Sequence, residues 1–247
     1  MRKLICADLQ RVLQKPGFWF FTVLILGINC VITVMNLKKG GDFSGLAYMF
    51  QFKGAYSGMS SILSLLVFSV VYCDEFRSMS FITVIGRGLS RQKLVYAKLI
   101  DAAVLTLLLF ALEGITMIVI GAVMCEPMTS NETGLLLFTI ARYFFESLIA
   151  ISLTSIFIYI TEKVPVSMFF LIVLQISSSV IQSLTSGLTK EVAMRLYFTE
   201  ILSNTWVDFV IGAHAKAIVT MLLCFLCYIS LSLVLIRITF GKKELNF

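Results

Sequence analysis

"LIDAAVLTLLLFALEGITMIVIGAV", residues 99–123, is the stretch that decides the fold. Its only charged residues are Asp101, near its start, and Glu113, near its middle. A helix needs about 20 mostly apolar residues to cross the hydrocarbon core of a bilayer. The stretch therefore predicts a transmembrane helix.

Apolar windows of the same kind recur along the whole chain, which has 247 residues. Hydrophobic residues make up 59% of it and charged residues 14%, with a mean hydropathy of +0.96. Soluble domains are roughly 45–50% apolar and about 25% charged. We therefore expect an all-α polytopic membrane protein, a single domain over residues 1–247, whose six spans lie in the windows 18–35, 56–72, 99–123, 135–160, 166–184 and 217–238.

The loops between the windows differ in positive charge. Lysine and arginine gather in the N-terminal segment, in the connection after the second window and in the C-terminal tail. Because cytoplasmic loops carry the excess of basic residues, we expect both termini and residues 73–98 in the cytoplasm. This asymmetry accounts for the net charge of +6 without a nucleic-acid partner, because no basic patch with interleaved aromatic residues stands apart from the membrane flanks.

Two segments outside the windows have a predicted structure of their own. In residues 1–15, apolar side chains recur at helical spacing with charged ones opposite, and Pro16 and Gly17 end the pattern. We expect an amphipathic helix in the membrane interface; the alternative is a solvated leader that only sets the topology. Residues 185–216, the longest connection, predict short helices over the outer end of the bundle.

Enzymatic chemistry has little support in the sequence. There is no glycine-rich phosphate loop ending in Gly-Lys-Ser/Thr and no GxSxG, and the single histidine, His214, has no companion ligands for a metal. The CxxC of Cys224 and Cys227 lies inside an apolar window, where thiols act as small packing residues. We therefore expect no catalytic residues, no metal site and no cofactor bound by this chain.

The cytoplasmic segment is the most informative one. Residues 74–98 read "DEFRSMSFITVIGRGLSRQKLVYAK". The pattern predicts a short helix with exposed apolar residues, then a turn at Gly86 and Gly88, then a helix capped by Ser90. An exposed apolar face invites burial against a partner. The alternative is an ordinary basic loop.

Here the sequence resembles a known family, the type-2 ATP-binding-cassette (ABC) transporter permeases. The resemblance is carried by Glu75, by the apolar stretch ending at Ile85, by Leu89-Ser90-Arg91 and by Lys98, although Met79-Ser80 stands where the family has Gly-Thr. In size and pattern the chain is similar to the permeases of lantibiotic-immunity and bacitracin-resistance exporters.

The resemblance implies a function. The chain would be the permease subunit of an exporter in the bacterial plasma membrane, paired with a second permease chain, identical or paralogous. Separate ATPase subunits would carry ATP and magnesium, and the substrate would be amphipathic, such as an antimicrobial peptide. The implied ATPase-coupling residues are Glu75, Phe76, Met79, Phe81, Ile85, Arg87, Ser90 and Arg91. The alternative is a non-transporting membrane sensor, assembly factor or scaffold.

Three charged residues fall inside predicted spans. At about 1.5 Å per residue, Glu113 lies roughly 15 Å from the outer end of the third window, and Arg142 and Glu146 lie roughly 10 and 16 Å from that of the fourth. Charges at such depth usually pair and face the bundle interior. We expect a buried cluster of the three, either a clamp between the third and fourth spans or part of a translocation surface.

The predicted topology can be tested by labelling. In a variant without native cysteines, Ser90→Cys should resist a membrane-impermeant maleimide in intact cells and react after permeabilisation. Asn131→Cys, in the predicted outer loop, should react in intact cells. Labelling of position 90 from outside intact cells would show that the true topology is the inverse of the predicted one.

Overall fold

The computed structural model describes residues 2–39, 53–77, 81, 85–86, 88–124, 130–184 and 197–242. Within these ranges the regular elements are helices, which confirms the all-α prediction there. They are α1 (Arg2–Leu13), α2 (Pro16–Lys39), α4 (Lys53–Phe68), the π-helix η1 (Ser69–Cys73), α5 (Asp74–Arg77), α7 (Arg91–Met124), α8 (Ser130–Thr161), α9 (Val164–Leu184), α11 (Phe198–Val210) and α12 (His214–Lys242).

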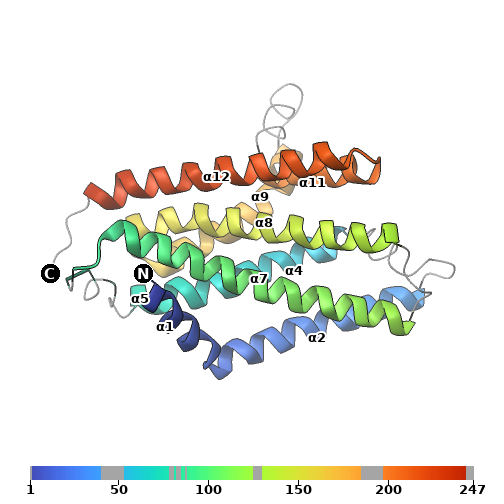
Figure 1. The fold of residues 1–247 in the computed structure, drawn as a ribbon, viewed down its shortest axis with the longest axis horizontal. Coiled ribbons are helices and arrows are strands. Elements are labelled where there is room, and N and C mark those ends of the chain that lie inside the picture. The colour runs from blue at the N-terminus through green and yellow to red at the C-terminus, as the bar shows by residue number, and fades with distance from the viewer. Residues whose placement is uncertain are drawn as a thin grey trace.

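The long helices lie side by side as an elongated bundle (Figure 1). α1, α5, the start of α7 and the end of α12 meet at its left end in this view. α1 and α2 bend by 64° relative to each other at the break before Pro16. Proline is tolerated in the first turn of a helix but removes a backbone donor, so the break falls where the sequence places Pro16-Gly17.

Three helical stretches are long and apolar enough to cross a membrane on their own: Arg91–Ile120, Thr133–Thr161 and His214–Phe240. The bent pair Leu4–Leu13 and Pro16–Val31 would make a fourth. In α9 only the shorter stretch Val164–Gln175 stands out as apolar. Within the described residues the structure thus supports three or four spans, fewer than the six that the windows predict.

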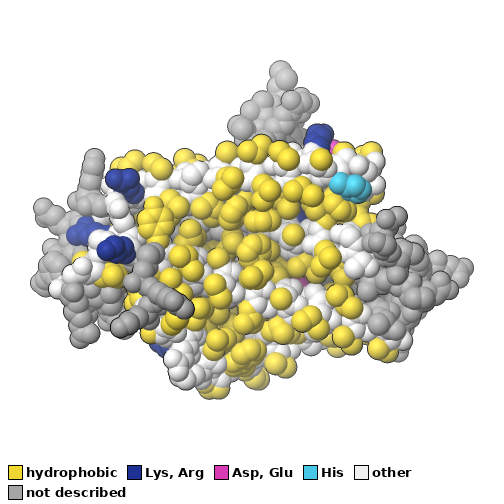
Figure 2. Space-filling view, in the orientation of Figure 1, with side chains coloured by type: hydrophobic (Ala, Val, Ile, Leu, Met, Phe, Trp, Pro, Cys, Tyr) yellow, Lys and Arg dark blue, Asp and Glu magenta, His cyan; other side chains and the backbone are white. Residues whose placement is uncertain are grey.

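The surface of the bundle carries many large apolar side chains. Hydrophobic side chains cover the middle of the face shown in Figure 2, and Lys and Arg gather near its left end. Large side chains such as Val23, Phe169 and Leu223 are 66%, 68% and 57% exposed. In water such a surface would be unfavourable, whereas lipid tails would cover it at no cost. The chain is therefore suited to membrane insertion.

Two apolar clusters fill the interior. The larger joins α1, α2, α4, η1, α5, α7, α8, α9 and α12, with Phe68, Tyr72 and Tyr159 almost completely buried at its centre. The smaller joins α8, α11 and α12, where the rings of Phe138 and Phe209 stack at 4.1 Å. α11 lies within the predicted outer connection, whose residues 185–196 fall outside the described ranges.

α7 and α8 approach closely at Gly114. A Cβ atom at this position would lie 2.7 Å from Cδ1 of Ile140, nearer than real Cβ atoms approach. A side chain at position 114 would therefore require the end of the Ile140 side chain to shift, and small residues at helix interfaces in membranes allow such close packing.

Replacing Gly114 by valine should lower the apparent melting temperature in detergent, because overpacking costs about 1–3 kcal/mol. The added Ile140→Ala should restore most of the loss by removing the obstructing methyl group. Gly27→Val is the matched control, since nothing lies within 4 Å of a Cβ atom there. Equal losses in Gly114→Val and Gly27→Val would contradict the close approach.

Candidate functional site

A buried lysine lies where three helices converge. Lys98 belongs to the second turn of α7, and its side chain is only 3% exposed. α1 packs against α7 here. α5, which follows α4 and η1 in the chain, lies at the same point. The π-helical turn lies immediately before α5; such turns are rare and frequently occur at functional sites.

Three carboxylates surround the Lys98 ammonium group. Its Nζ donates a hydrogen bond to Oδ2 of Asp8 in α1 at 2.7 Å and a second one to Oε1 of Glu75 in α5. Oδ2 of Asp101, one turn further along α7, lies 3.9 Å away. One side chain thus links α1, α5 and α7.

Two further cations lie near these carboxylates. Nη2 of Arg11 lies 3.6 Å from Oε1 of Glu75 and 3.8 Å from Oδ1 of Asp8. Lys15, at the bend between α1 and α2, forms an ion pair with Asp74, the first residue of α5. We call Asp8, Arg11, Glu75, Lys98 and Asp101 the charge network; the Lys15–Asp74 pair lies at its exposed edge.

The network is mutually dependent because its centre is dry. Asp8, Glu75, Lys98 and Asp101 are all at most 9% exposed. A buried charge that loses its partner is strongly unfavourable, by about 3–5 kcal/mol. Each member therefore holds the others in place, and α5 is fixed to the helices on both sides of it.

The predicted coupling residues Phe76, in α5, and Phe81, beyond its end, pack into an aromatic cluster. Their rings stack at 4.6 Å, and Phe76 meets the edge of Tyr159 in α8 at 5.5 Å. Both side chains are buried, with Phe81 only 1% exposed. The expectation that these residues form an exposed face is wrong, because the aromatic cluster around Tyr159 already covers them within the chain.

The remaining predicted coupling residues lie around the turn. Gly88 has φ +93° and donates its N–H to the carbonyl oxygen of Ile85 at 2.9 Å. Oγ of Ser90 accepts a hydrogen bond from the Lys93 N–H at 3.4 Å, as an N-cap does. Nη1 of Arg91 donates to the carbonyl oxygen of Phe240 in α12 at 2.7 Å. Met79 and Arg87 lie outside the described residues.

Glu113 is buried against α2. Its Oε1 accepts a hydrogen bond from Nδ2 of Asn29 at 2.9 Å, so a neutral amide on the neighbouring helix is its partner. Its Oε2 has no hydrogen-bond partner among the described residues. We expected Glu113 to contact the fourth span. Its hydrogen bond instead joins α7 to α2.

Arg142 and Glu146 are both buried one turn apart on α8. The Arg142 guanidinium lies 4.3 Å from the centre of the Tyr143 ring. Within the described chain no ion pair joins Arg142 to Glu113 or Glu146.

Sequence analysis assigned no site role to four of the residues described here. Asp8 sits on the polar side of the N-terminal helix, where solvent exposure is the ordinary expectation. Lys98 entered only as one of the residues that carry the family resemblance, and Asp101 reads as the start of a span. Asn29, the only asparagine in the window 18–35, was the one available signal for a buried polar contact.

No family model matches the chain, and no curated protein matches it.

Replacing Lys98 by methionine should sharply destabilise the protein. The substitution leaves Asp8, Glu75 and Asp101 buried without their central cation, at a cost of about 3–5 kcal/mol. Thermal unfolding in detergent should show a fall of several degrees. Adding Glu75→Gln and Asp8→Asn should recover part of it.

The matched control is Lys216→Met. Lys216 is also in an ion pair, with Oδ1 of Asp208 at 3.0 Å, but its side chain is 69% exposed. Exposed pairs contribute about 0–1 kcal/mol. Similar melting temperatures for the two variants would show that the buried network does not hold the helices together.

Proposed function

We propose that this chain is the membrane-spanning permease subunit of an ATP-driven ABC exporter. Six spans would cross a bacterial plasma membrane with both termini inside. Two permease chains, identical or paralogous, would form the pathway. ATP and magnesium would bind to separate ATPase subunits, and the substrate would be an amphipathic molecule such as an antimicrobial peptide, a choice that rests on the family resemblance alone.

The observation that carries the proposal is the attachment of α5 to its neighbours. Glu75 lies at the start of the segment that the resemblance assigns to ATPase contact, and Lys98 lies beyond its end. The ion pair between Glu75 and Lys98 joins the two ends of this segment. The ion pair between Asp8 and Lys98 connects these ends to α1. A push on the segment would therefore move α1, α5 and α7 together rather than bend a loose loop.

The burial of Phe76 and Phe81 changes where an ATPase would bind. Both rings belong to the interior, so they would stiffen the segment from within. Gly86, Gly88, Ser90 and Lys93 are exposed, and this turn would be the part that an ATPase reaches. Coupling then requires that the turn make different contacts in the ATP-bound and ATP-free states.

Gly88 offers a specific test of this arrangement. Alanine at φ +93° is strained by roughly 1–2 kcal/mol, and nothing lies within 4 Å of a Cβ atom there, so the substitution would alter the shape of the turn without a clash. Gly212, between α11 and α12, has φ +94° and the same open space. Gly212→Ala is therefore a control of equal backbone strain at a distance from the turn.

The experiment measures ATP hydrolysis and transport by the chain reconstituted with an ATPase from an adjacent reading frame that contains a phosphate-binding loop. Gly88→Ala should lower permease-stimulated ATP hydrolysis and transport severalfold, and Gly212→Ala should leave both near the original level. Similar melting temperatures would show that the two variants fold equally well. Failure of the original chain to bind or stimulate an ATPase would favour the sensor, assembly-factor or scaffold alternative.

A further inference from the structure

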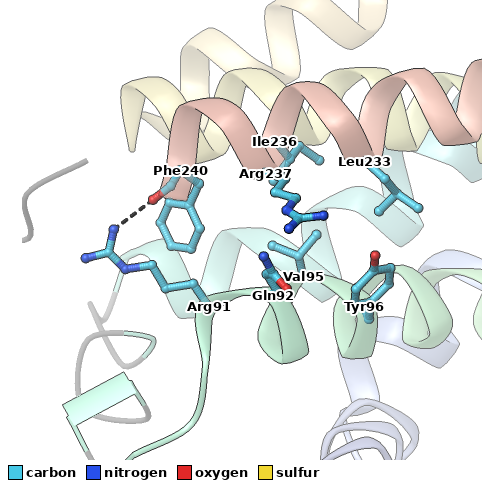
Figure 3. Close-up of a pocket in the computed structure, with 8 residues that line it drawn as sticks. All are labelled: Arg91, Gln92, Val95, Tyr96, Leu233, Ile236, Arg237 and Phe240. Carbon is cyan, nitrogen blue, oxygen red and sulfur yellow. Dashed lines mark hydrogen bonds between the residues drawn. The ribbon is translucent and has the colours of Figure 1, made fainter. Parts of the chain in front are cut away.

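A groove opens between the start of α7 and the end of α12 (Figure 3). It is partly open to the outside. The two helices belong to the same end of the bundle as the charge network. No residue of the charge network lines this groove, and of the predicted ATPase-coupling residues that the structure describes only Arg91 does.

The groove has an apolar floor. Val95 of α7 and Leu233 and Ile236 of α12 line it. Tyr96, also in the lining, is 45% exposed, with an apolar ring and a polar hydroxyl. Tyrosine is enriched where membrane and water meet because one end of it is apolar and the other wet.

Two arginines supply the charge of the groove. Arg237 reaches from α12 towards α7 in Figure 3 and has no ion-pair or hydrogen-bond partner among the described residues. Arg91 is held at the groove by its hydrogen bond to the Phe240 carbonyl oxygen, and its guanidinium lies 5.5 Å from the centre of the Phe240 ring. No described carboxylate lines the groove.

We propose that this groove binds an anionic phospholipid. Arg237 and Arg91 would hold the phosphate, with the Tyr96 hydroxyl as a further donor, and one acyl chain would lie over Val95, Leu233 and Ile236. Guanidinium groups bind phosphate oxygens through strong charge-assisted hydrogen bonds. A soluble anion would leave the apolar floor uncovered, whereas a lipid satisfies both parts of the groove. The proposal requires only that the chain lies in a membrane and does not depend on the exporter assignment.

The test uses the full chain in a neutral detergent, with bound lipid counted by native mass spectrometry. Phosphatidylglycerol is titrated against phosphatidylcholine with identical acyl chains. The phosphatidylglycerol should bind more tightly, and Arg237→Gln should weaken it about tenfold, as expected for the loss of one charge-assisted hydrogen bond. Leu233→Trp, which fills the floor without changing charge, should also weaken it.

Lys93→Gln is the matched control. Lys93 is an exposed cation in the first turn of α7, near Arg91, and it does not line the groove. It should leave the binding unchanged. Equal binding of the two lipids, or equal losses in Arg237→Gln and Lys93→Gln, would overturn the proposal. So would competition by glycerol phosphate at the same concentration as the lipid, since that would make the groove a site for a free anion.

Discussion

The burial of the Lys98 ammonium group is the constraint on which the rest of this end of the molecule depends. A cation removed from water requires anionic partners at close range, and the chain supplies them from α1, α5 and α7 itself. The position of α5 follows from this requirement. With Glu75 directed at Lys98, the next residue, Phe76, is turned towards the aromatic rings of α8. Charge on one side and aromatic packing on the other thus fix a helix of only four residues.

Two of the charged side chains buried within the long helices also have partners, but these partners are uncharged. Glu113 meets an amide rather than a cation, and Arg142 lies over an aromatic ring. Both arrangements satisfy a polar group while keeping the surrounding helices close. The first connects α2 with α7, and the second lies within α8.

The all-helical architecture could be predicted from sequence because composition and the length of apolar runs are local properties. The break at Pro16-Gly17, the glycine at positive φ and the cap at Ser90 were likewise readable, because each depends on the chemistry of one or two residues. The pairing of side chains that are distant in the chain could not be predicted from the sequence. Asp8 and Lys98 are 90 residues apart and Asn29 and Glu113 are 84 apart, and one sequence carries no record of such pairings. Phe81 looks exposed in a segment between spans, and only the position of Tyr159 shows that it is not.

The separation between Asp8 and Lys98 has a consequence for biogenesis. At translation rates of about 5–20 residues per second, roughly 5–20 s pass between synthesis of the aspartate and synthesis of the lysine. During that interval α1 has no counter-ion from α7 and cannot settle into its final place. Completion of this end of the molecule is therefore a late event, because a nascent chain stopped before α7 lacks the cation that joins Asp8 to Glu75.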